Sequence, residues 1–244
     1  MEKNPNFPQL FAGMAVLGAS VVVASTIAGV AITRLRSQDV LTVIGSAKRP
    51  IRSDYVVWRS SVTAQQPTLR SAYQELKSYS DRVLFYLGSQ GIPSEAVSLS
   101  AVNTETIYET INGVSTGKVQ SYRLTQSFTV SSSDVDGITR LVQTSGELIS
   151  EGVPFSSEAP EYVYTKLSDL RVEMLAAATE DAKRRAEAIL KVTGRRPGAI
   201  RAAETDVFQI TRRFSTEVSN MGSYDTSTID KDITAVVAIT FSVE

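Results

Sequence analysis

The chain has 244 residues, carries 25 Lys and Arg against 26 Asp and Glu, and contains neither His nor Cys. The absence of imidazole excludes a Ser-His-Asp hydrolase and histidine-ligated metal sites. The absence of thiols excludes disulfides, Cys nucleophiles and Cys-type zinc or iron–sulfur sites. The net charge of −1 argues against a dedicated nucleic-acid binder, which normally has a basic excess. These absences exclude particular classes of enzyme and metal site without naming an activity, and no residue stands out as a catalytic, cofactor-binding or metal-binding candidate.

The first predicted element is a hydrophobic helix at the N-terminus. No charged residue lies between Lys3 and Arg34, and residues 10–32 are all apolar or small. A helix of about 20 such residues can span a lipid bilayer. The sequence predicts that residues 1–36 form a transmembrane signal anchor with short flanks. A cleaved signal peptide is the alternative, but the apolar run exceeds a typical signal-peptide core and no A-x-A site follows it.

Small residues recur at four-residue spacing along this helix. In lipid such spacing lets helix backbones approach closely, so it predicts self-association. The residues concerned are Ala15, Ala19, Ser20, Ala24, Ser25, Ala28 and Gly29. Arg34 and Arg36 follow the apolar run, and the positive-inside tendency slightly favours a body on the cytoplasmic side.

The first half of the body alternates strand and helix patterns. Residues 41–47 and 55–64 predict strands, and residues 67–90 predict an amphipathic helix that ends before Gly91 and Pro93. Two further strands are expected at residues 97–110 and 118–130, around the hairpin signal Asn112-Gly113. Ser131–Ser133 are candidate N-caps for a helix over residues 134–150.

The second half repeats this order. A strand is predicted over residues 153–167 and a helix over residues 168–194, whose Ala-rich face should pack close to a sheet. Strands are then expected over residues 199–213 and 232–243, the last alternating strictly with Ile233, Ala235 and Val237 on one face.

This order predicts an α+β fold. The body, residues 37–244, would comprise two βαββ-like units, 54–130 and 153–243, joined by the connector helix 134–150. If helices cover one face of each sheet, the other face needs cover from the partner unit or from another subunit.

The polar stretch over residues 214–231 is long for a loop in a compact domain. A surface hairpin tip is the simplest interpretation. The alternative is an assembly arm that contacts another subunit, with Phe214, Met221 and Tyr224 as its candidate contact residues.

Few other residues suggest chemistry. Ser46 and Lys48 lack a second motif for Ser-Lys catalysis, and the acidic pairs Glu180-Asp181 and Glu147/Glu151 are typical of solvated helix surfaces. Basic residues cluster in three places, for which surface pairing is expected and contact with an anionic lipid or ligand is the alternative. The clusters are Lys183-Arg184-Arg185, Arg195-Arg196 and Arg212-Arg213.

Several segments, in their order and spacing, resemble those of SIMPL-domain proteins over roughly residues 40–244. The segments are LTVIGSAKRPIRSDYVVWRSSVTA, YRLTQSFTV, ELISEGVPF, MLAAATEDAKRRAEAILKVTG with RRPGAIRAAET, and ITAVVAITFSV. The chain departs from the family pattern at Gly45-Ser46-Ala47, where a G-x-G is usual, and at Ser53-Asp54, where a Pro-Asp pair is usual.

The resemblance implies a bacterial envelope protein with an α+β fold, exported to the periplasm, in a family without an agreed enzyme activity. Some members are similar to hollow ring or barrel oligomers proposed as channel-like, and others are linked to oxidative-stress tolerance. We therefore expect a non-enzymatic, single-pass protein of the inner membrane, with its body in the periplasm, that forms a homo-oligomer. A periplasmic binding module, holding a small molecule or an envelope polypeptide between its two units, is the alternative.

Overall fold

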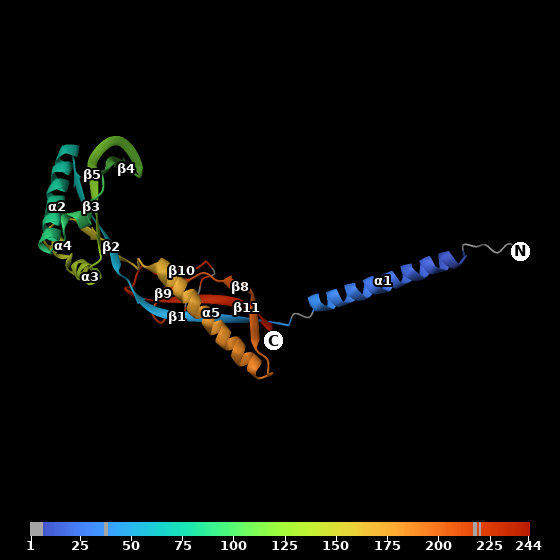
Figure 1. The fold of residues 1–244 in the computed structure, drawn as a ribbon. Coiled ribbons are helices and arrows are strands. Elements are labelled where there is room, and N and C mark those ends of the chain that lie inside the picture. The colour runs from blue at the N-terminus through green and yellow to red at the C-terminus, as the bar shows by residue number, and fades with distance from the viewer. Residues whose placement is uncertain (1–6, 37–38, 217–218, 220) are drawn as a thin grey trace. The chain divides into compact units, whose positions relative to one another are not determined.

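The computed structural model describes residues 7–36, 39–216, 219 and 221–244, with the backbone alone for residues 7–11 and 28–36. The chain divides into two compact units. Unit 1 comprises Met1–Ser46, Ala176–Asp206 and Val236–Glu244, and unit 2 comprises Ala47–Leu175 and Val207–Ala235. The chain is a mixture of helices and sheets, so the predicted α+β class is confirmed (Figure 1).

The N-terminal element is the helix α1 (Phe7–Arg36). Its described side chains, those of residues 12–27, are all exposed. Within the residues that the structure describes, no helix is both long and apolar enough to cross a membrane. The predicted packing residues Ala15, Ala19, Ser20, Ala24 and Ser25 lie on α1, whereas the side chains of Ala28 and Gly29 lie outside the described residues. Helix self-association stays a prediction.

Unit 2 contains a six-stranded sheet built around the pair β2 (Tyr55–Gln66) and β5 (Val114–Ser132). Beyond β5 lie β3 (Val97–Leu99) and β4 (Asn103–Ile111), and beyond β2 lie β6 (Phe155–Ser157) and β7 (Glu161–Val163), all antiparallel to their neighbours. The single strands predicted over residues 97–110 and 153–167 are therefore each two strands.

Three helices supply the apolar cover of this sheet: α2 (Leu69–Ser89), α3 (Val135–Thr144) and α4 (Glu147–Ser150). A short 3-10 turn, η1 (Ser94–Ala96), precedes β3. The inward side chains of β2 and β5 alternate with outward ones, as a half-buried sheet requires. The core that they form with the helices includes Trp58, Val62, Leu124, Phe128, Leu76, Val83, Ile138 and Leu148.

The opposite face of this sheet is polar. Its side chains include Arg59, Ser61 and Thr63 on β2, and Thr125 and Ser127 on β5. The hydroxyls of Thr63 and Thr125 hydrogen-bond across the strands at 3.0 Å. An antiparallel sheet can leave such a face in water. This polar face therefore does not need the second cover that we expected from the sequence.

Capping explains where the helices of unit 2 begin. Thr68 is the N-cap of α2 and accepts a hydrogen bond from the Ser71 amide. Asp134 is the N-cap of α3 and accepts from the Gly137 amide, so the predicted caps at Ser131–Ser133 are wrong by one residue or more. The predicted helix over residues 134–150 is interrupted between α3 and α4, and the side chain of Ile149 on α4 is exposed.

The hairpin signal is confirmed. Asn112 and Gly113 have φ values of 49° and 81°, and Ile111 pairs with Val114 directly across the turn. Positive φ at both central residues is the condition for the tight turn that Asn-Gly favours.

The second sheet joins β1 (Val40–Arg52), β11 (Asp230–Val243), β9 (Gln209–Arg212) and β10 (Ser223–Tyr224) in that order, with β8 (Pro197–Thr205) also paired to β11. The helix α5 (Leu167–Lys191) crosses this sheet in Figure 1. The strand predicted over residues 199–213 is thus two strands, β8 and β9. The segment 214–231, predicted as a loop, contains β10 and the start of β11.

In unit 1, the small residues Ala178, Ala182 and Ala186 of α5 are fully buried, as the prediction of close packing required. The inward alternation of β11 is also confirmed, because Val237, Ile239 and Phe241 are buried. Ile189, near the C-terminal end of α5, is exposed.

The predicted second unit, residues 153–243, does not form one sheet. Its first strands, β6 and β7, pair with β2, and β1 takes the place beside β11. Periodicity predicts that a segment is a strand, but it does not specify which strand becomes its neighbour.

Candidate functional site

The candidate site lies in unit 1, at the C-terminal end of α5. The helix ends in a Schellman-type turn: the Arg195 amide donates to the Leu190 carbonyl at 3.1 Å, and Gly194 has a φ of 72°. The Arg196 amide then donates to the Glu244 carbonyl at 2.8 Å, and the Glu244 amide returns a bond of 2.9 Å. This backbone pairing fixes the turn between α5 and β8 against the end of the chain.

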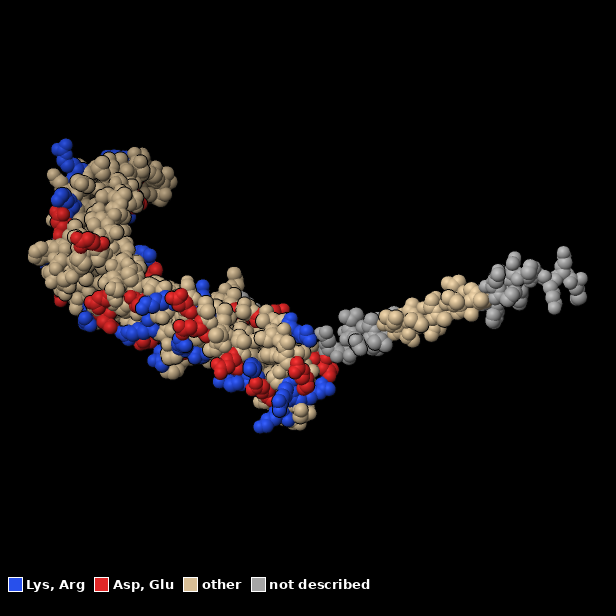
Figure 2. Space-filling view, in the orientation of Figure 1, with Lys and Arg blue, Asp and Glu red and all other residues tan. Residues whose placement is uncertain are grey.

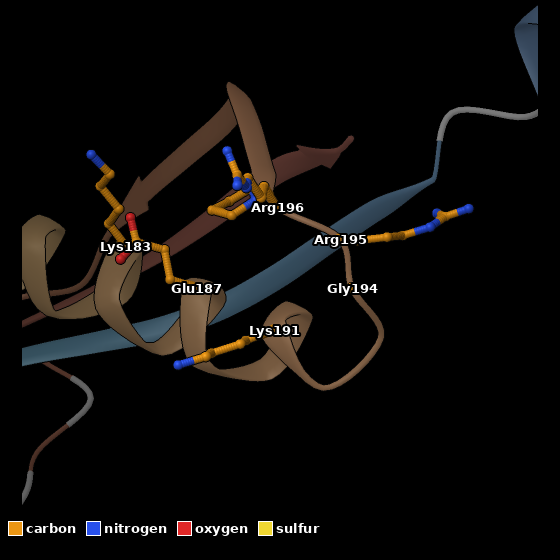
Figure 3. A pocket seen from close by; sticks show the side chains of 7 residues that line it. Lys183, Glu187, Lys191, Gly194, Arg195 and Arg196 are labelled. Atoms are coloured by element: carbon orange, nitrogen blue, oxygen red, sulfur yellow. The ribbon is translucent and has the colours of Figure 1, made fainter.

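Beside this turn is a pocket of about 640 Å³ (Figure 3). Lys183, Glu187 and Lys191 come from successive turns of α5, because residues four apart lie on one helix face. The lining residues are Lys183, Glu187, Lys191, Gly194, Arg195, Arg196 and Pro197. Four cationic side chains thus share the pocket with a single carboxylate.

The cations differ in their partners. Arg195 forms an ion pair with Asp39 at 2.5 Å, and in Figure 3 its side chain points away from Lys183. Among the described residues, Lys183, Lys191 and Arg196 have no carboxylate within ion-pair distance. The pocket therefore presents three cations whose charge no neighbouring acid of the described chain pairs directly.

Asp181 separates the rest of the first basic cluster from this pocket. Its carboxylate accepts from the Ser46 amide at 3.0 Å and from Arg185 at 2.7 Å, and it lies 3.5 Å from Arg184. The bond from the Ser46 amide, and then those from the two guanidinium groups, hold the pKa of Asp181 below its ordinary value. Within the basic cluster 183–185, Arg184 and Arg185 therefore pair with Asp181, whereas Lys183 lines the pocket.

The remaining candidates from the sequence are held in structural contacts. Lys48 pairs with Asp232 at 3.1 Å, and the Ser46 amide is bound to Asp181, so the two do not form a Ser-Lys pair. Glu151 accepts two hydrogen bonds from the Arg82 guanidinium, which lower the pKa of the Glu151 carboxyl. In the described part of the chain, no three acidic side chains lie close enough together to hold a metal ion.

The candidate assembly arm has exposed apolar side chains. Phe214 and Met221 are 83% and 93% exposed, and the Arg213 guanidinium lies 5.1 Å from the centre of the Phe214 ring. Tyr224 lies on β10, and its hydroxyl accepts a hydrogen bond from the Tyr164 amide. Residues 217, 218 and 220 of this segment lie outside the described residues. Whether the arm contacts another subunit stays a prediction.

One buried charge was missed by the sequence interpretation. Lys231 is fully buried, and its ammonium donates to the Tyr162 carbonyl at 2.8 Å. Burial lowers the pKa of the Lys231 ammonium, and the nearby charge of Asp225 opposes that shift. The alternation of β11 could have predicted this burial, because Lys231 lies two residues before Ile233 and therefore on the same inward face as Ile233 and Ala235.

The fold and the site define an α+β protein that has two antiparallel-rich sheets, a separate N-terminal helix and a basic pocket. The model of the SIMPL family, described as proteins of unknown function (DUF541), matches residues 41–241. The chain belongs to the SIMPL family, and the resemblance drawn from its segments is confirmed. No curated protein matches the chain.

Proposed function

We propose that this chain is a non-enzymatic, membrane-anchored envelope protein that assembles into a ring or barrel-like homo-oligomer through the β4–β5 hairpin. In this proposal α1 anchors the chain in the inner membrane, and the body faces the periplasm. The observation that carries the assembly is the exposed far end of the hairpin, where the apolar side chains of Ile111, Val114 and Val119 face solvent. A role in envelope stress would be exercised by the assembled form.

The anchor is supported by the sequence of α1 and by its polar side chains. The segment from Asn4 to Thr33 is free of charge. The hydroxyls of Ser20, Ser25 and Thr26 donate to carbonyls of their own helix, at 2.7 to 2.8 Å. A helix in lipid must satisfy its polar groups internally, and these bonds do so.

The hairpin is the least covered part of unit 2. Residues 111–120 are all exposed, and among the described strands β4 pairs with β5 alone. Ile111 and Val114 at the turn are 64% and 70% exposed, and Tyr108 and Val119 are exposed as well. On the face that Figure 2 shows, few charged side chains are visible in this region, and the hairpin's charges include the ion pairs Lys118–Glu109 and Arg123–Glu105. A two-stranded ribbon without a core is marginally stable in water, so a partner would stabilise it.

Strand β4 also offers a free edge to such a partner. An unpaired edge presents amide and carbonyl groups that can extend a sheet into another chain. Register shifts on both sides of Tyr108 mark bulges that interrupt the ladder, so the regular part of this edge is residues 103–107; β5 curves strongly through this region in Figure 1. Since the other face of the sheet is polar, edge pairing is favoured over face-to-face packing as the mode of assembly.

Mass photometry of the detergent-solubilised full chain tests the proposal. We expect particles at a multiple of the 26.4 kDa chain mass, after subtraction of the detergent. The double variant Ile111→Asp/Val114→Asp places charge at the turn and should shift the particles to monomers. The matched control is Ile149→Asp, which adds charge at another exposed isoleucine of unit 2 and should leave the assembly unchanged. A monomeric wild type, or an assembly unaffected by the double variant, would refute the proposal.

A further inference from the structure

We propose that the pocket at the end of α5 binds the phosphate of an anionic phospholipid headgroup, with phosphatidylglycerol as the preferred class. The inference rests on the proposed membrane anchoring by α1, and it assigns a ligand to the surface of unit 1 next to that anchor.

Charge is the first step. Lys183, Lys191 and Arg196 bring three cations without an ion-pair partner in the described chain to a pocket that contains only Glu187 as an acid. Over the region that holds the end of α5, Figure 2 shows Lys and Arg side chains interspersed with Asp and Glu side chains, so the basic character belongs to the pocket lining. Phosphate oxygens form strong, charge-assisted hydrogen bonds with ammonium and guanidinium groups.

Position along the chain is the second step. Arg195 of the pocket pairs with Asp39 at 2.5 Å, and the Asp39 carbonyl accepts from the Val243 amide at 2.9 Å. Asp39 follows the last residue of α1, Arg36, by three positions. A chain spans at most about 3.6 Å per residue, so connectivity alone keeps Asp39 within roughly 11 Å of the end of α1. If α1 spans the bilayer, connectivity therefore keeps the end of α5 close to one membrane surface.

Size and the single acid are the third step. A volume of about 640 Å³ is large enough for a headgroup rather than for one small ion. In Figure 3, Glu187 projects near Lys183, so an acceptor lies beside the donors. A carboxylate there can accept from the hydroxyls of a glycerol headgroup while the cations hold its phosphate. The quaternary ammonium of phosphatidylcholine has no N–H or O–H to donate.

Native mass spectrometry of the detergent-solubilised full chain tests the inference. Short-chain phosphatidylglycerol, short-chain phosphatidylcholine and inorganic phosphate are added in separate titrations. We expect phosphatidylglycerol to be retained in preference to phosphatidylcholine, with little competition from inorganic phosphate. The variant Lys183→Gln/Arg196→Gln should weaken retention at least about tenfold, because each lost charged hydrogen bond is worth more than that factor.

The control variant is Lys77→Gln/Arg82→Gln, which removes two positive charges from α2 in unit 2. It should bind phosphatidylglycerol as the wild type does, whereas Lys191→Gln should reproduce part of the loss. Equal binding by the pocket variant, absence of a preference over phosphatidylcholine, or full competition by inorganic phosphate would overturn the inference.

The same spectra separate this inference from the proposed function. A monomer that retains phosphatidylglycerol would refute assembly and support the pocket. An oligomer without lipid preference would refute the pocket and support assembly. Membrane flotation of the full chain tests the anchor independently of both.

Discussion

Gly45 on β1 lies so close to α5 that a Cβ atom placed on it would stand 2.2 Å from the carbonyl oxygen of Ala178. The same Cβ would lie 2.5 Å from the Ala182 amide nitrogen. Both contacts are to backbone, which cannot rotate away as a flexible side chain can. Glycine at position 45, with alanines on the facing helix, lets the strand and the helix of unit 1 approach this closely.

We predict that Gly45→Ala lowers the free energy of unfolding by about 1–3 kcal/mol or more, since overpacking forces the backbones apart. Thermal unfolding of the full chain measures the loss. Gly88→Ala is the matched control, because Gly88 lies in α2 and an added Cβ would meet nothing within 4 Å beyond its own helix. That substitution should raise stability by about 0.5–1 kcal/mol through its gain in helix propensity. Equal stability of Gly45→Ala and the wild type would contradict the close approach.

The helices and the Asn-Gly hairpin were predictable because their signals are local. The Ala-rich face of α5 predicted close packing, and Asn112-Gly113 predicted the turn. Strand neighbours were not predictable, because β1 and β11 lie far apart in sequence while β6 and β7 join β2. The breaks within the predicted strands were also missed. β8 and β9 both have strand-like patterns, and only residues 206–208 separate them.

Asp181 should stabilise unit 1 at neutral pH through its bond from the Ser46 amide. Its pKa is lowered in the folded chain, so its contribution is present above the unfolded-state aspartate pKa of about 3.9 and is lost as the pH falls below that value. We predict that Asp181→Asn lowers Tm by roughly 2–4 °C at pH 7. The difference from the wild type should shrink in acid, which circular dichroism melts at pH 3 to 7 would reveal.

Asp81→Asn provides the comparison for this experiment. Asp81 pairs with Lys77 one helical turn away on exposed α2, at 2.8 Å, and such surface pairs contribute little. The Tm of Asp81→Asn should therefore stay close to that of the wild type at every pH. If the Tm difference between Asp181→Asn and the wild type stayed the same in acid, the negative charge of the Asp181 carboxylate would not contribute to the stability of the chain.

The buried Lys231 should be more costly than useful to stability, unlike the carboxylate beside it. Because burial disfavours the charged form of Lys231, we predict that Lys231→Met, which removes the charge and keeps a similar volume, maintains or raises Tm even though the Tyr162 carbonyl loses its donor. Asp225 accepts hydrogen bonds from the Ser227 amide and from the hydroxyls of Ser227 and Thr228, so Asp225→Ala, which leaves these donors without their acceptor, should lower the free energy of unfolding by about 1–3 kcal/mol. Chemical denaturation of both variants measures these values.

The pH dependence gives a second check on Lys231. Because burial lowers its pKa, the unfolded chain binds more protons in the alkaline range below the ordinary lysine pKa of about 10.4. Wild-type stability should therefore rise with pH relative to Lys231→Met in that range. A constant difference between the two would mean that Lys231 titrates as an exposed lysine does.

The pocket was only half visible in the sequence. The basic clusters at 183–185 and 195–196 are evident in the sequence. Lys183 and Arg196 line one pocket because the chain folds back at the turn after α5, and Arg184 and Arg185 are not part of it because they pair with Asp181. The role of Asp39 depends on a partner far along the chain. Ion pairs of this kind follow from tertiary structure, which local pattern does not specify.

The absence of Cys makes the orientation of the body directly measurable. Single substitutions Gln74→Cys on α2 and Asn4→Cys before the apolar run each introduce the only thiol of the chain. In intact spheroplasts we predict that a membrane-impermeant maleimide labels Gln74→Cys, whereas it labels Asn4→Cys only after permeabilisation. The reverse pattern would place the body in the cytoplasm, as Arg34 and Arg36 alone would suggest.

Single thiols on β4 test the edge that we propose for assembly. Antiparallel pairing of β4 across a two-fold axis joins two copies, and a second contact would then link such dimers into a ring. Residues opposite each other across that axis have Cα atoms about 4.5–5.5 Å apart, within disulfide range. We predict that, among Thr104→Cys, Thr106→Cys and Thr110→Cys, the one nearest the axis forms a disulfide dimer rapidly on mild oxidation. Non-reducing gel electrophoresis detects it, and Gln74→Cys, which is exposed on α2, should stay monomeric on the gel. Assembly without a cross-link at any β4 position would show that the subunits meet elsewhere, with Phe214 and Met221 of the candidate assembly arm as the next surface to test.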